Sequence, residues 1–464
     1  MFGVGVGGDI EILWREFQQK ISHTSSGQIS DMAVLFESME NFFNMLGDSV
    51  IPAHRQGFHM SNLPCITLNR YAQERSKKQH PWIFSNEIAD PKLFQRQPAG
   101  SLVDVLDCRG DYVGTGFTNP KSLISIRIFS RQRGQLLDTE FFEKKIRMAI
   151  SYRDLAFGKE SGFGGTYRAV FGESDGLPGL VIDRFASLWV IEPHALGMKL
   201  RLPEIAAAIE KIDSKAVVIH RSDNRAAQLE GMPEESGVLM GDWKPGTYFA
   251  MEDGIAFPVD PLQGQKTGFF FDQRANRTFF RSWISEMAKQ KSVRVLDVFC
   301  HAGAWGLRAL QAGAKEVVFV DRSRAALDGV KAVAKSMGMI DRIQCIEGDA
   351  LEILKSLDEK SFDAIALDPP ALIPNKKSLA QGSKNYKALQ VASLRLAKSG
   401  SILSTSSCSY HLDEERFEEV VAKSVLESGR GAKVLQRGGP SADHPYLPGM
   451  KEGRYLKNVF LWLD

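Results

Sequence analysis

The fold of this chain follows from one stretch, Val295-Leu296-Asp297-Val298-Phe299-Cys300-His301-Ala302-Gly303-Ala304-Trp305-Gly306. An apolar strand that carries one acid runs into a tight turn of small residues, and a helix begins after it. Strands and helices alternate from about Val259 to the end of the chain, which is typical of a parallel sheet with crossover helices. Ligands of such open sheets bind at the carboxyl ends of the strands. The sequence therefore predicts an α/β domain with a ligand site at this turn.

The apolar pattern on both sides of this stretch predicts the other elements of the same domain. Strands are expected at residues 294–299, 316–321, 342–347, 364–368 and 401–406, and two more at 432–436 and 457–463. Helices are expected near residues 305–312, 324–337, 351–357, 384–396 and 413–427. Because the first five strands are expected to run parallel, the residues that follow them should meet at one edge of the sheet.

Acids stand at three successive strands, which points to a polar cofactor. Asp297 lies in the first strand, Asp321 closes the second, where it can accept hydrogen bonds from ribose hydroxyls, and Asp349 follows the third, where it can accept from an adenine amino group. Any one of them could instead be a simple cap. A dinucleotide would need G-x-G-x-x-G for its pyrophosphate, whereas Cys300-His301 replaces the first glycine here. S-adenosylmethionine (SAM), which has no phosphate, fits better, and the predicted cofactor-binding residues are Asp297, Phe299, Cys300, Gly303, Asp321, Asp349, Asp368 and Pro369.

A carboxylate and a thiol are predicted to meet at the same edge. The fourth strand ends in Asp368-Pro369-Pro370-Ala371 and the fifth in Ser406-Ser407-Cys408-Ser409. Methylation at C5 of a pyrimidine needs a nucleophile that first adds to C6, and a thiolate is suited to that step. Cys408 is the predicted nucleophile, and Asp368 is the second predicted catalytic residue, placed to hold the N3 and amino edge of the base. The base must be unstacked first, which costs least in single-stranded RNA.

The composition excludes several classes of protein. The chain has 464 residues, of which 43% are hydrophobic and 25% charged, as in an ordinary globular protein, and no stretch approaches the roughly 20 apolar residues of a membrane helix. Five cysteines in so long a chain do not form a disulfide framework and favour a reducing cytosol. The thiols of Cys65, Cys108, Cys300 and Cys345 are expected to be structural or incidental. No set of residues around Cys408 and His411 has zinc spacing, so no metal site is expected.

Two further domains and a leader are predicted ahead of the α/β domain. Residues 63–137 show short strands at 65–68, 101–106, 111–117 and 123–129, typical of a small β-domain. Residues 138–258 combine helices at 138–155 and 202–212 with short strands into an α+β domain, and residues 259–464 form the α/β domain. Residues 1–62 are a leader. They are either an accessory helical segment or upstream sequence that precedes a native start at Met60.

The charge is uneven along the chain. The net charge of +2 combines −4 over residues 1–60 with +6 over the rest. Four basic residues, Arg70, Arg75, Lys77 and Lys78, precede Trp82 in the run His80-Pro81-Trp82-Ile83-Phe84. A basic cluster beside aromatic residues suits phosphate contact with base stacking. These residues are predicted to bind RNA, and the other explanation is a β-domain that serves as a structural cap.

These motifs together resemble a known family, the large-subunit ribosomal RNA cytosine-5 methyltransferases I. The resemblance rests on residues 297–303, Asp368-Pro369-Pro370, Ser407-Cys408-Ser409, the segment 264–274 (GQKTGFFFDQR) and Ala442-Asp443-His444-Pro445. His80-Pro81-Trp82-Ile83-Phe84 resembles the RNA-binding PUA domain of that family. The match runs from about Leu63 to Asp464, which is nearly the whole chain except the leader.

The resemblance implies a fold, a reaction and a partner. The fold is a PUA domain, a central α+β domain and a class I SAM-dependent methyltransferase domain. The product is 5-methylcytosine in 23S ribosomal RNA (rRNA), with Cys408 as nucleophile, and a homodimer is left open. The segment 264–274 is expected beside the cofactor and target pocket, with Arg274 as an RNA contact. Other RNA cytosine-5 methyltransferases carry a second cysteine in the fourth-strand motif for product release, and Asp368-Pro369-Pro370-Ala371 lacks it.

Two other functions are compatible with the sequence. Related methyltransferases with similar cofactor loops act on guanine and lack the cysteine of Ser407-Cys408-Ser409. The other is an RNA-binding or ribosome-assembly factor whose methyltransferase fold no longer turns over. The intact acids of the cofactor site argue against this last function.

Overall fold

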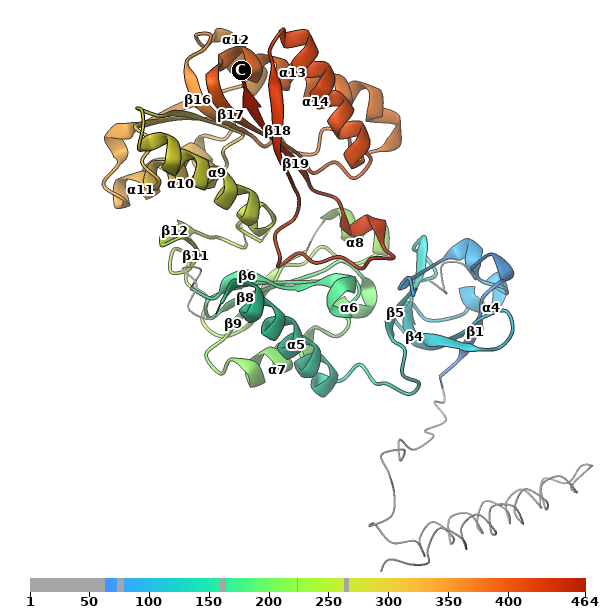
Figure 1. Cartoon of the computed structure of the whole chain (residues 1–464). Coiled ribbons are helices and arrows are strands. Elements are labelled where there is room, and N and C mark those ends of the chain that lie inside the picture. The colour runs from blue at the N-terminus through green and yellow to red at the C-terminus, as the bar shows by residue number, and fades with distance from the viewer. Residues whose placement is uncertain (1–62, 73–78, 159–163, 223, 263–266) are drawn as a thin grey trace, which may run out of the picture. The chain divides into compact units, whose positions relative to one another are not determined.

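The computed structural model describes residues 63–72, 79–158, 164–222, 224–262 and 267–464 (Figure 1). The predicted leader, residues 1–62, lies outside them, as do the predicted RNA-binding residues Arg75, Lys77 and Lys78 and residues 264–266 of the segment 264–274. Residues 61–464 form one compact unit. Among the described helices, none has the length and apolar character needed to cross a membrane.

The first sheet has five short strands in the order β1-β3-β4-β5-β2. They are β1 (Cys65–Thr67), β2 (Trp82–Phe84), β3 (Leu102–Leu106), β4 (Tyr112–Thr118) and β5 (Ile124–Ser130), with the short helix α4 (Pro91–Gln95) before β3. Alternate apolar side chains, among them Ile66, Val103, Val105 and Ile126, are fully buried in its own core. Four of these strands are predicted from the sequence, whereas β2 is too short to show a strand period.

A second sheet follows in the order β10-β9-β8-β7-β6. Its strands are β6 (Thr166–Phe171), β7 (Leu180–Phe185), β8 (Leu188–Pro193), β9 (Val217–His220) and β10 (Gly237–Met240). The predicted helices α5 (Thr139–Phe157) and α7 (Leu202–Ile212) share one buried core with it. The remaining elements are α6 (Leu196–Lys199), α8 (Asn224–Glu230) and the hairpin of β11 (Phe249–Glu252) and β12 (Ile255–Pro258).

The third large sheet has seven strands in the order β15-β14-β13-β16-β17-β19-β18. Five run parallel, namely β13 (Arg294–Val298), β14 (Glu316–Asp321), β15 (Ile343–Glu347), β16 (Phe362–Leu367) and β17 (Ala397–Ser407). The last two, β18 (Ala432–Gly438) and β19 (Lys457–Leu463), are antiparallel to their neighbours, with β19 inserted beside β17. The predicted parallel α/β domain is thus confirmed, and the direction of the last two strands is added by the structure.

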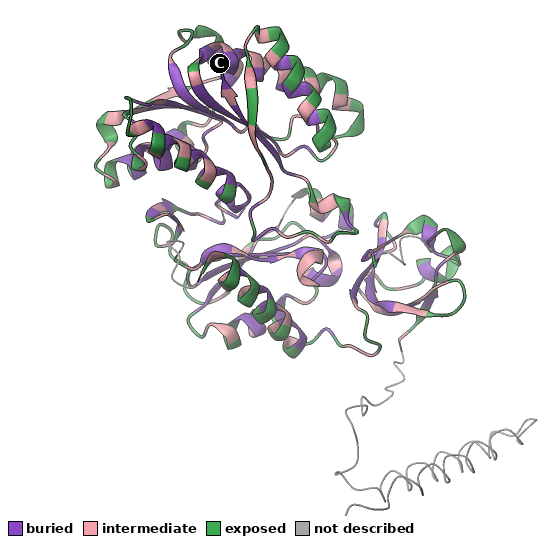
Figure 2. Ribbon diagram, viewed as in Figure 1, coloured by how far each residue is buried: buried purple, intermediate pink, exposed green. Residues whose placement is uncertain are grey.

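Helices cover both faces of this sheet, because its central strands are apolar on both sides. Val295 and Val317 share a core with α9 (Arg274–Ala288), α10 (Ala304–Gln311) and α11 (Arg324–Ser336). Leu296 and Val318 face the other way, toward α12 (Ala350–Ser356), α13 (Leu379–Leu396) and α14 (Glu414–Ser428). Figure 2 shows the buried strands between helices that expose their outer sides. The large sheets fall within the predicted segments 63–137, 138–258 and 259–464, whose boundaries stay a prediction.

Helix α13 begins five residues before its predicted start at residue 384. The early turn contains Gly382, which reads as a helix breaker in sequence. In the structure a Cβ at this position would lie 2.2 Å from Ile373 Cγ1 and 2.6 Å from the Leu372 carbonyl oxygen. Glycine is therefore needed inside the helix because the loop after β16 passes directly against it.

Candidate functional site

A cavity of about 1130 Å³ opens at the carboxyl edge of the seven-stranded sheet. Its walls come from the loops that follow β13, β14, β15, β16 and β17 and from residues of the segment 269–277. Parallel strands end at one edge, so residues far apart in the sequence meet there. The cavity is lined by seven of the predicted site residues, namely Phe299, Cys300, Asp321, Asp349, Asp368, Pro369 and Cys408.

The loop after β13 has a backbone that few residues adopt. Phe299, His301 and Gly303 have φ angles of +62°, +47° and +72°, and such angles cost non-glycine residues on the order of 1–3 kcal/mol. Gly303 is also the N-cap of α10. Backbone strain of this kind gathers at ligand-binding loops, where the surrounding structure over-determines the conformation.

Asp297 lies under this loop and not on the cavity wall. It is fully buried, and its Oδ2 accepts a hydrogen bond from the Gly306 amide at 2.9 Å. Burial is the main cause that raises its pKa to about 7. Odd-numbered residues of β13 face α10, so this side chain ties the strand to the start of the helix. Neither Asp297 nor Gly303 is among the residues that line the cavity; both hold the loop, and their direct contact with the cofactor stays a prediction.

Gly306 supplies a test of that loop. A Cβ on Gly306 would lie 2.3 Å from Phe319 Cε1, with Phe319 itself fully buried on β14. We expect Gly306→Ala to destabilise the fold by about 1–3 kcal/mol, because the extra methyl overpacks the contact between α10 and β14. Urea unfolding monitored by circular dichroism measures the change.

The matched control is Gly329→Ala in α11. A Cβ at Gly329 would have no atom within 4 Å, and alanine is favoured over glycine within a helix by about 1 kcal/mol. This variant should therefore be as stable as the parent or slightly more stable. Equal stability of both variants would contradict the close packing of α10 on β14.

Asp321 and Asp349 stand on the cavity wall at the ends of β14 and β15. The Asp321 carboxylate accepts from the amides of His301 and Ser323, both at 2.9 Å, so it joins two of the lining loops. Asp349 caps α12 by accepting from the Leu351 amide at 3.0 Å and forms an ion pair with Arg322 at 2.7 Å. The hydrogen bond from Arg322 is the largest cause that lowers the pKa of Asp349. Asp349 is thus a helix cap, which is the simple role that any one of these acids could have, and it also lines the cavity.

Asp368 is held by two side chains that the sequence analysis does not single out. Its Oδ1 accepts from Gln273 Nε2 at 2.8 Å, and its Oδ2 accepts from Trp305 Nε1 at 3.3 Å. Burial, and then the charge of Asp272, raises the pKa of Asp368 to about 6. Gln273 also donates to Ser406 Oγ at 3.1 Å, so one amide links the ends of β16 and β17. Gln273 falls in the segment 264–274, which is the only sequence signal that points to it.

Cys408 follows directly after β17, between two serines that Tyr386 of α13 holds. The Tyr386 hydroxyl lies 3.0 Å from Ser407 Oγ and 2.9 Å from Ser409 Oγ. None of the five cysteines is in a disulfide, and the Cys408 side chain is half-buried on the cavity wall. Tyr386 is a second residue that sequence reasoning missed, because a buried tyrosine within a helix looks like ordinary core.

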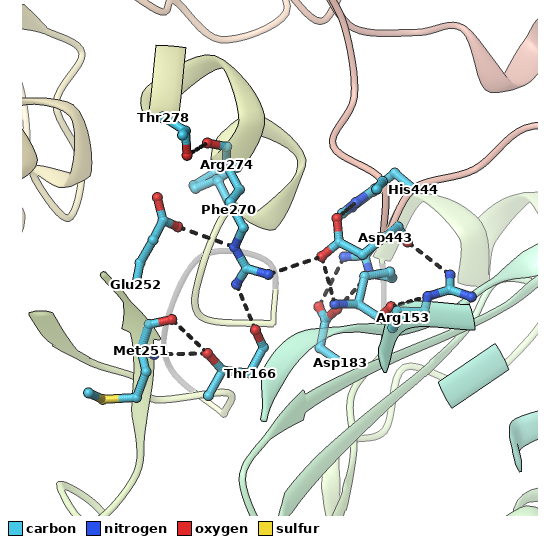
Figure 3. Close-up of polar contacts among 12 residues, drawn as sticks. Arg153, Thr166, Asp183, Met251, Glu252, Phe270, Arg274, Thr278, Asp443 and His444 are labelled. Carbon is cyan, nitrogen blue, oxygen red and sulfur yellow. Dashed lines mark hydrogen bonds and ion pairs between the residues drawn. The ribbon is translucent and has the colours of Figure 1, made fainter. Parts of the chain in front are cut away.

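Arg274 is not exposed to an RNA partner, which contradicts its predicted role. The side chain is 2% exposed and lies between Glu252 and Asp443, at 3.7 Å and 3.8 Å. Its Nη2 donates to the Thr166 carbonyl at 2.6 Å (Figure 3). Arg153 donates to the Asp443 carbonyl at 2.9 Å in the same network. The guanidinium thus joins α9 to β6 and to the loop after β18, and Arg274 is structural.

The remaining predicted RNA-binding residues that the structure describes are Arg70 and Trp82. Arg70 is exposed and its guanidinium carbon lies 5.2 Å from the centre of the Tyr71 ring. Trp82 is half-buried, donates its indole N–H to Glu173 at 2.7 Å, and has the Arg127 guanidinium 5.4 Å from its ring centre. Trp82 therefore already packs against the second sheet's loops, which leaves less of its ring for a base.

The cavity carries mostly negative charge. Four carboxylates line it, those of Asp272, Asp321, Asp349 and Asp368, against the guanidiniums of Arg277 and Arg322. Such a lining disfavours a pyrophosphate and suits a ligand with hydroxyl, amino or cationic groups. A thiol and a carboxylate share the wall, as nucleophilic catalysis on a bound base requires.

Two family models and several known proteins match this chain. The chain matches the family model described as a PUA-like domain over residues 66–131 and the model described as conserved hypothetical protein 95 over residues 272–395. It is 31% identical over 396 residues to the ribosomal RNA large subunit methyltransferase I of Photobacterium profundum, covering 84% of this chain and 97% of that protein. For the protein of the same name from Tolumonas auensis, the identity is 33% over 402 residues, covering 85% and 98%.

A solved structure has the same fold. It is SMU.776, described as a methyltransferase and complexed with SAH, and it is similar to 86% of this chain and to 100% of its own, with a TM-score of 0.72. A SAM-dependent methyltransferase structure from Streptococcus mutans matches with a TM-score of 0.71 over the same shares. Both are 17% identical to this chain, so they bear on the fold alone.

Proposed function

This chain belongs to the ribosomal RNA large subunit methyltransferase I family, and from that premise we propose that it transfers the methyl group of SAM to C5 of a cytosine in 23S rRNA. The observation that carries the reaction is the cavity at the sheet edge, where Cys408 and Asp368 lie on one wall with the loop after β13. A thiol so placed is the nucleophile that C5 methylation needs.

The residues of the cavity fit SAM. Asp321 keeps carboxylate lone pairs beside those used by the amides of His301 and Ser323, and these suit ribose hydroxyls. The strained loop after β13 places Phe299 and Cys300 on the wall. The acidic lining favours a cationic sulfonium over a phosphate. When bound, SAM supplies an electrophilic methyl group.

Cys408 and the base carry the covalent steps. The thiolate adds to C6 of the cytosine, and the electron pair released into the ring makes C5 nucleophilic, so that C5 takes the methyl group. Loss of the C5 proton to a base then expels the Cys408 thiolate and restores the ring. The target must be flipped out of its stack to reach the thiol, which is the reason for a single-stranded target.

Asp368 is suited to the edge of the base. Addition of the thiolate places negative charge on N3, and a nearby proton stabilises that charge. With a pKa of about 6, Asp368 holds its proton in part of the molecules at neutral pH and can give it to N3 as a general acid. Gln273 and Trp305 donate to its two oxygens and fix its orientation.

The RNA-binding surface remains a prediction of the sequence. Arg70, Arg75, Lys77 and Lys78 supply the basic cluster for rRNA phosphates, and the PUA-like match over residues 66–131 supports their place in an RNA-binding domain. The homodimer also stays a prediction. A reducing cytosol remains the expected location.

Product analysis tests the reaction. The protein is incubated with tritiated SAM and protein-free 23S rRNA, with 16S rRNA as the matched control substrate, and the digested nucleosides are separated. We expect label in 5-methylcytidine from 23S rRNA alone. Label in a methylguanosine would show that the guanine enzyme is correct instead. No label, together with no heat on calorimetric titration with SAM, would favour the ribosome-assembly factor.

A further inference from the structure

Lys457 lies buried beside the proposed nucleophile. It is the first residue of β19, and it stands directly opposite Ser407 in the antiparallel pair of β17 and β19. Only 3% of the residue is exposed. Its ammonium donates to the carbonyl oxygens of Ser409 and Tyr455, both at 2.7 Å. The ammonium therefore reaches the Ser409 carbonyl, one residue beyond Cys408.

The ammonium has no carboxylate partner close to it. Within the described residues, no carboxylate oxygen lies within 4.0 Å of Lys457 Nζ, although the chain forms many other ion pairs. Burying a cation is costly unless it is paired, and two neutral carbonyls compensate only in part.

Cys408 lies between the two residues that Lys457 meets, because Lys457 stands opposite Ser407 in the strand pair and its ammonium donates to the Ser409 carbonyl oxygen. Burial lowers its pKa to about 8, and negative charge on Cys408 opposes that shift first, followed by Asp413 and Glu414 at the start of α14. Tyr386 of α13 contacts Ser407 and Ser409 through its hydroxyl. Burial raises the pKa of this hydroxyl, so the hydroxyl is neutral. Of these groups, Asp413 and Glu414 are side chains at the exposed end of a helix. The Cys408 thiol, half-buried on the cavity wall, is the group that can supply the counter-charge.

We propose that the Lys457 ammonium is a positioning residue that holds Cys408 as a thiolate before the RNA binds. This inference rests on the proposed role of Cys408. The attraction between two charges is mutual. A thiolate that stabilises the ammonium is therefore stabilised by it to the same extent. A stabilised thiolate adds to C6 without a separate base to remove its proton. It is also a better leaving group at the last step, where this chain has Ala371 and no second cysteine.

Alkylation of Cys408 measures the thiolate without SAM or RNA. Iodoacetamide reacts with the thiolate, so its rate against pH gives the ionisation midpoint, and mass spectrometry of the Cys408 peptide separates it from the other four thiols. We expect a midpoint in the wild-type protein below the value near 8.5 of a free cysteine. In Lys457→Met the midpoint should rise by about one to three pH units, the range for loss of an adjacent opposite charge.

Two further variants separate charge from structure. Lys457→Arg keeps the charge and should leave the midpoint close to that of the wild type. Lys433→Met removes an exposed lysine of the neighbouring strand β18, paired with Asp464 at 2.8 Å, and should also leave it unchanged. An equal rise in Lys457→Arg and Lys457→Met would overturn the proposal, and so would an unchanged midpoint in Lys457→Met.

The wild-type measurement decides the matter even if Lys457→Met does not fold. A wild-type midpoint at or above that of a free cysteine would overturn the role of Lys457 without any variant. Failure of the proposed function would give a different result, namely methylation of rRNA by a variant that lacks the Cys408 thiol. The alkylation midpoint would then still report on Lys457.

Discussion

Replacing Cys408 by serine should abolish methyl transfer to rRNA, with a loss in kcat on the order of 10⁴-fold or more, as for other enzymes that lose their nucleophile. Serine keeps the size of the side chain between Ser407 and Ser409, but its hydroxyl does not ionise near neutral pH and is a poor nucleophile without an activating base. The base would then reach the cavity and remain inert at C5. Tritium transfer from SAM to 23S rRNA, measured under single-turnover conditions, gives the loss.

Cofactor binding and a second cysteine supply the controls. Cys408→Ser should bind SAM with unchanged affinity by calorimetry, because the acids and the loop after β13 are untouched. Cys108→Ser, at an exposed cysteine of the first domain, should retain full activity. Normal turnover by Cys408→Ala would refute the nucleophile assignment.

Replacing Glu252 by glutamine should cause the largest loss of stability. Glu252 is fully buried and accepts from Arg277 at 2.7 Å and 2.6 Å and from Arg308 at 2.6 Å, with Arg274 at 3.7 Å. Three buried guanidiniums would lose their shared counter-charge, and breaking such a buried group costs about 3–5 kcal/mol. Urea unfolding gives the change in the free energy of unfolding.

The control is Glu316→Gln on the surface. Glu316 pairs with Arg294 at 3.1 Å while both side chains are about a third or more exposed, and such pairs contribute roughly 0–1 kcal/mol. A loss at Glu252 no larger than at Glu316 would contradict the buried network.

Because of Glu252, the free energy of unfolding should also depend on pH. The arginines, chiefly Arg277, hold the pKa of Glu252 at about 2, below its ordinary value of 4.5. A depressed folded-state pKa means that the stabilisation is present above pH 4.5 and is lost as the pH falls toward 2. The wild-type protein should therefore lose more stability than Glu252→Gln over this window. Equal losses of stability in the wild type and in Glu252→Gln would contradict this prediction.

The elements with a clean apolar period were predictable. The strands β14 and β19 and the helix α7 lie at the predicted residues, because alternation and helical spacing depend on residues that are neighbours in the sequence. Helix α9 was missed because the first half of its buried face is Arg274, Asn276 and Arg277. A buried face made of charged residues hides the helix from any hydrophobic pattern.

Part of the candidate site was also predictable from the sequence. Parallel strands bring their carboxyl ends together, so the meeting of Asp321, Asp368 and Cys408 on one cavity follows from strand order alone. Gln273 and Trp305 could not be found this way, since they reach Asp368 from helices and loops whose docking is a matter of packing.

The sequence by itself determined the parallel α/β domain and the strand ends that meet at the cavity, with Cys408 among the residues that follow them. Only the tertiary structure decided that Arg274 is buried and structural, that Asp297 lies beneath the loop, and that Lys457 reaches the Ser409 carbonyl. The physical reason is that patterns along the chain set which face of an element is apolar. The partner of a buried charge depends instead on how distant elements close around it, as β19 does when it pairs with β17 and carries an ammonium to the loop that holds Cys408.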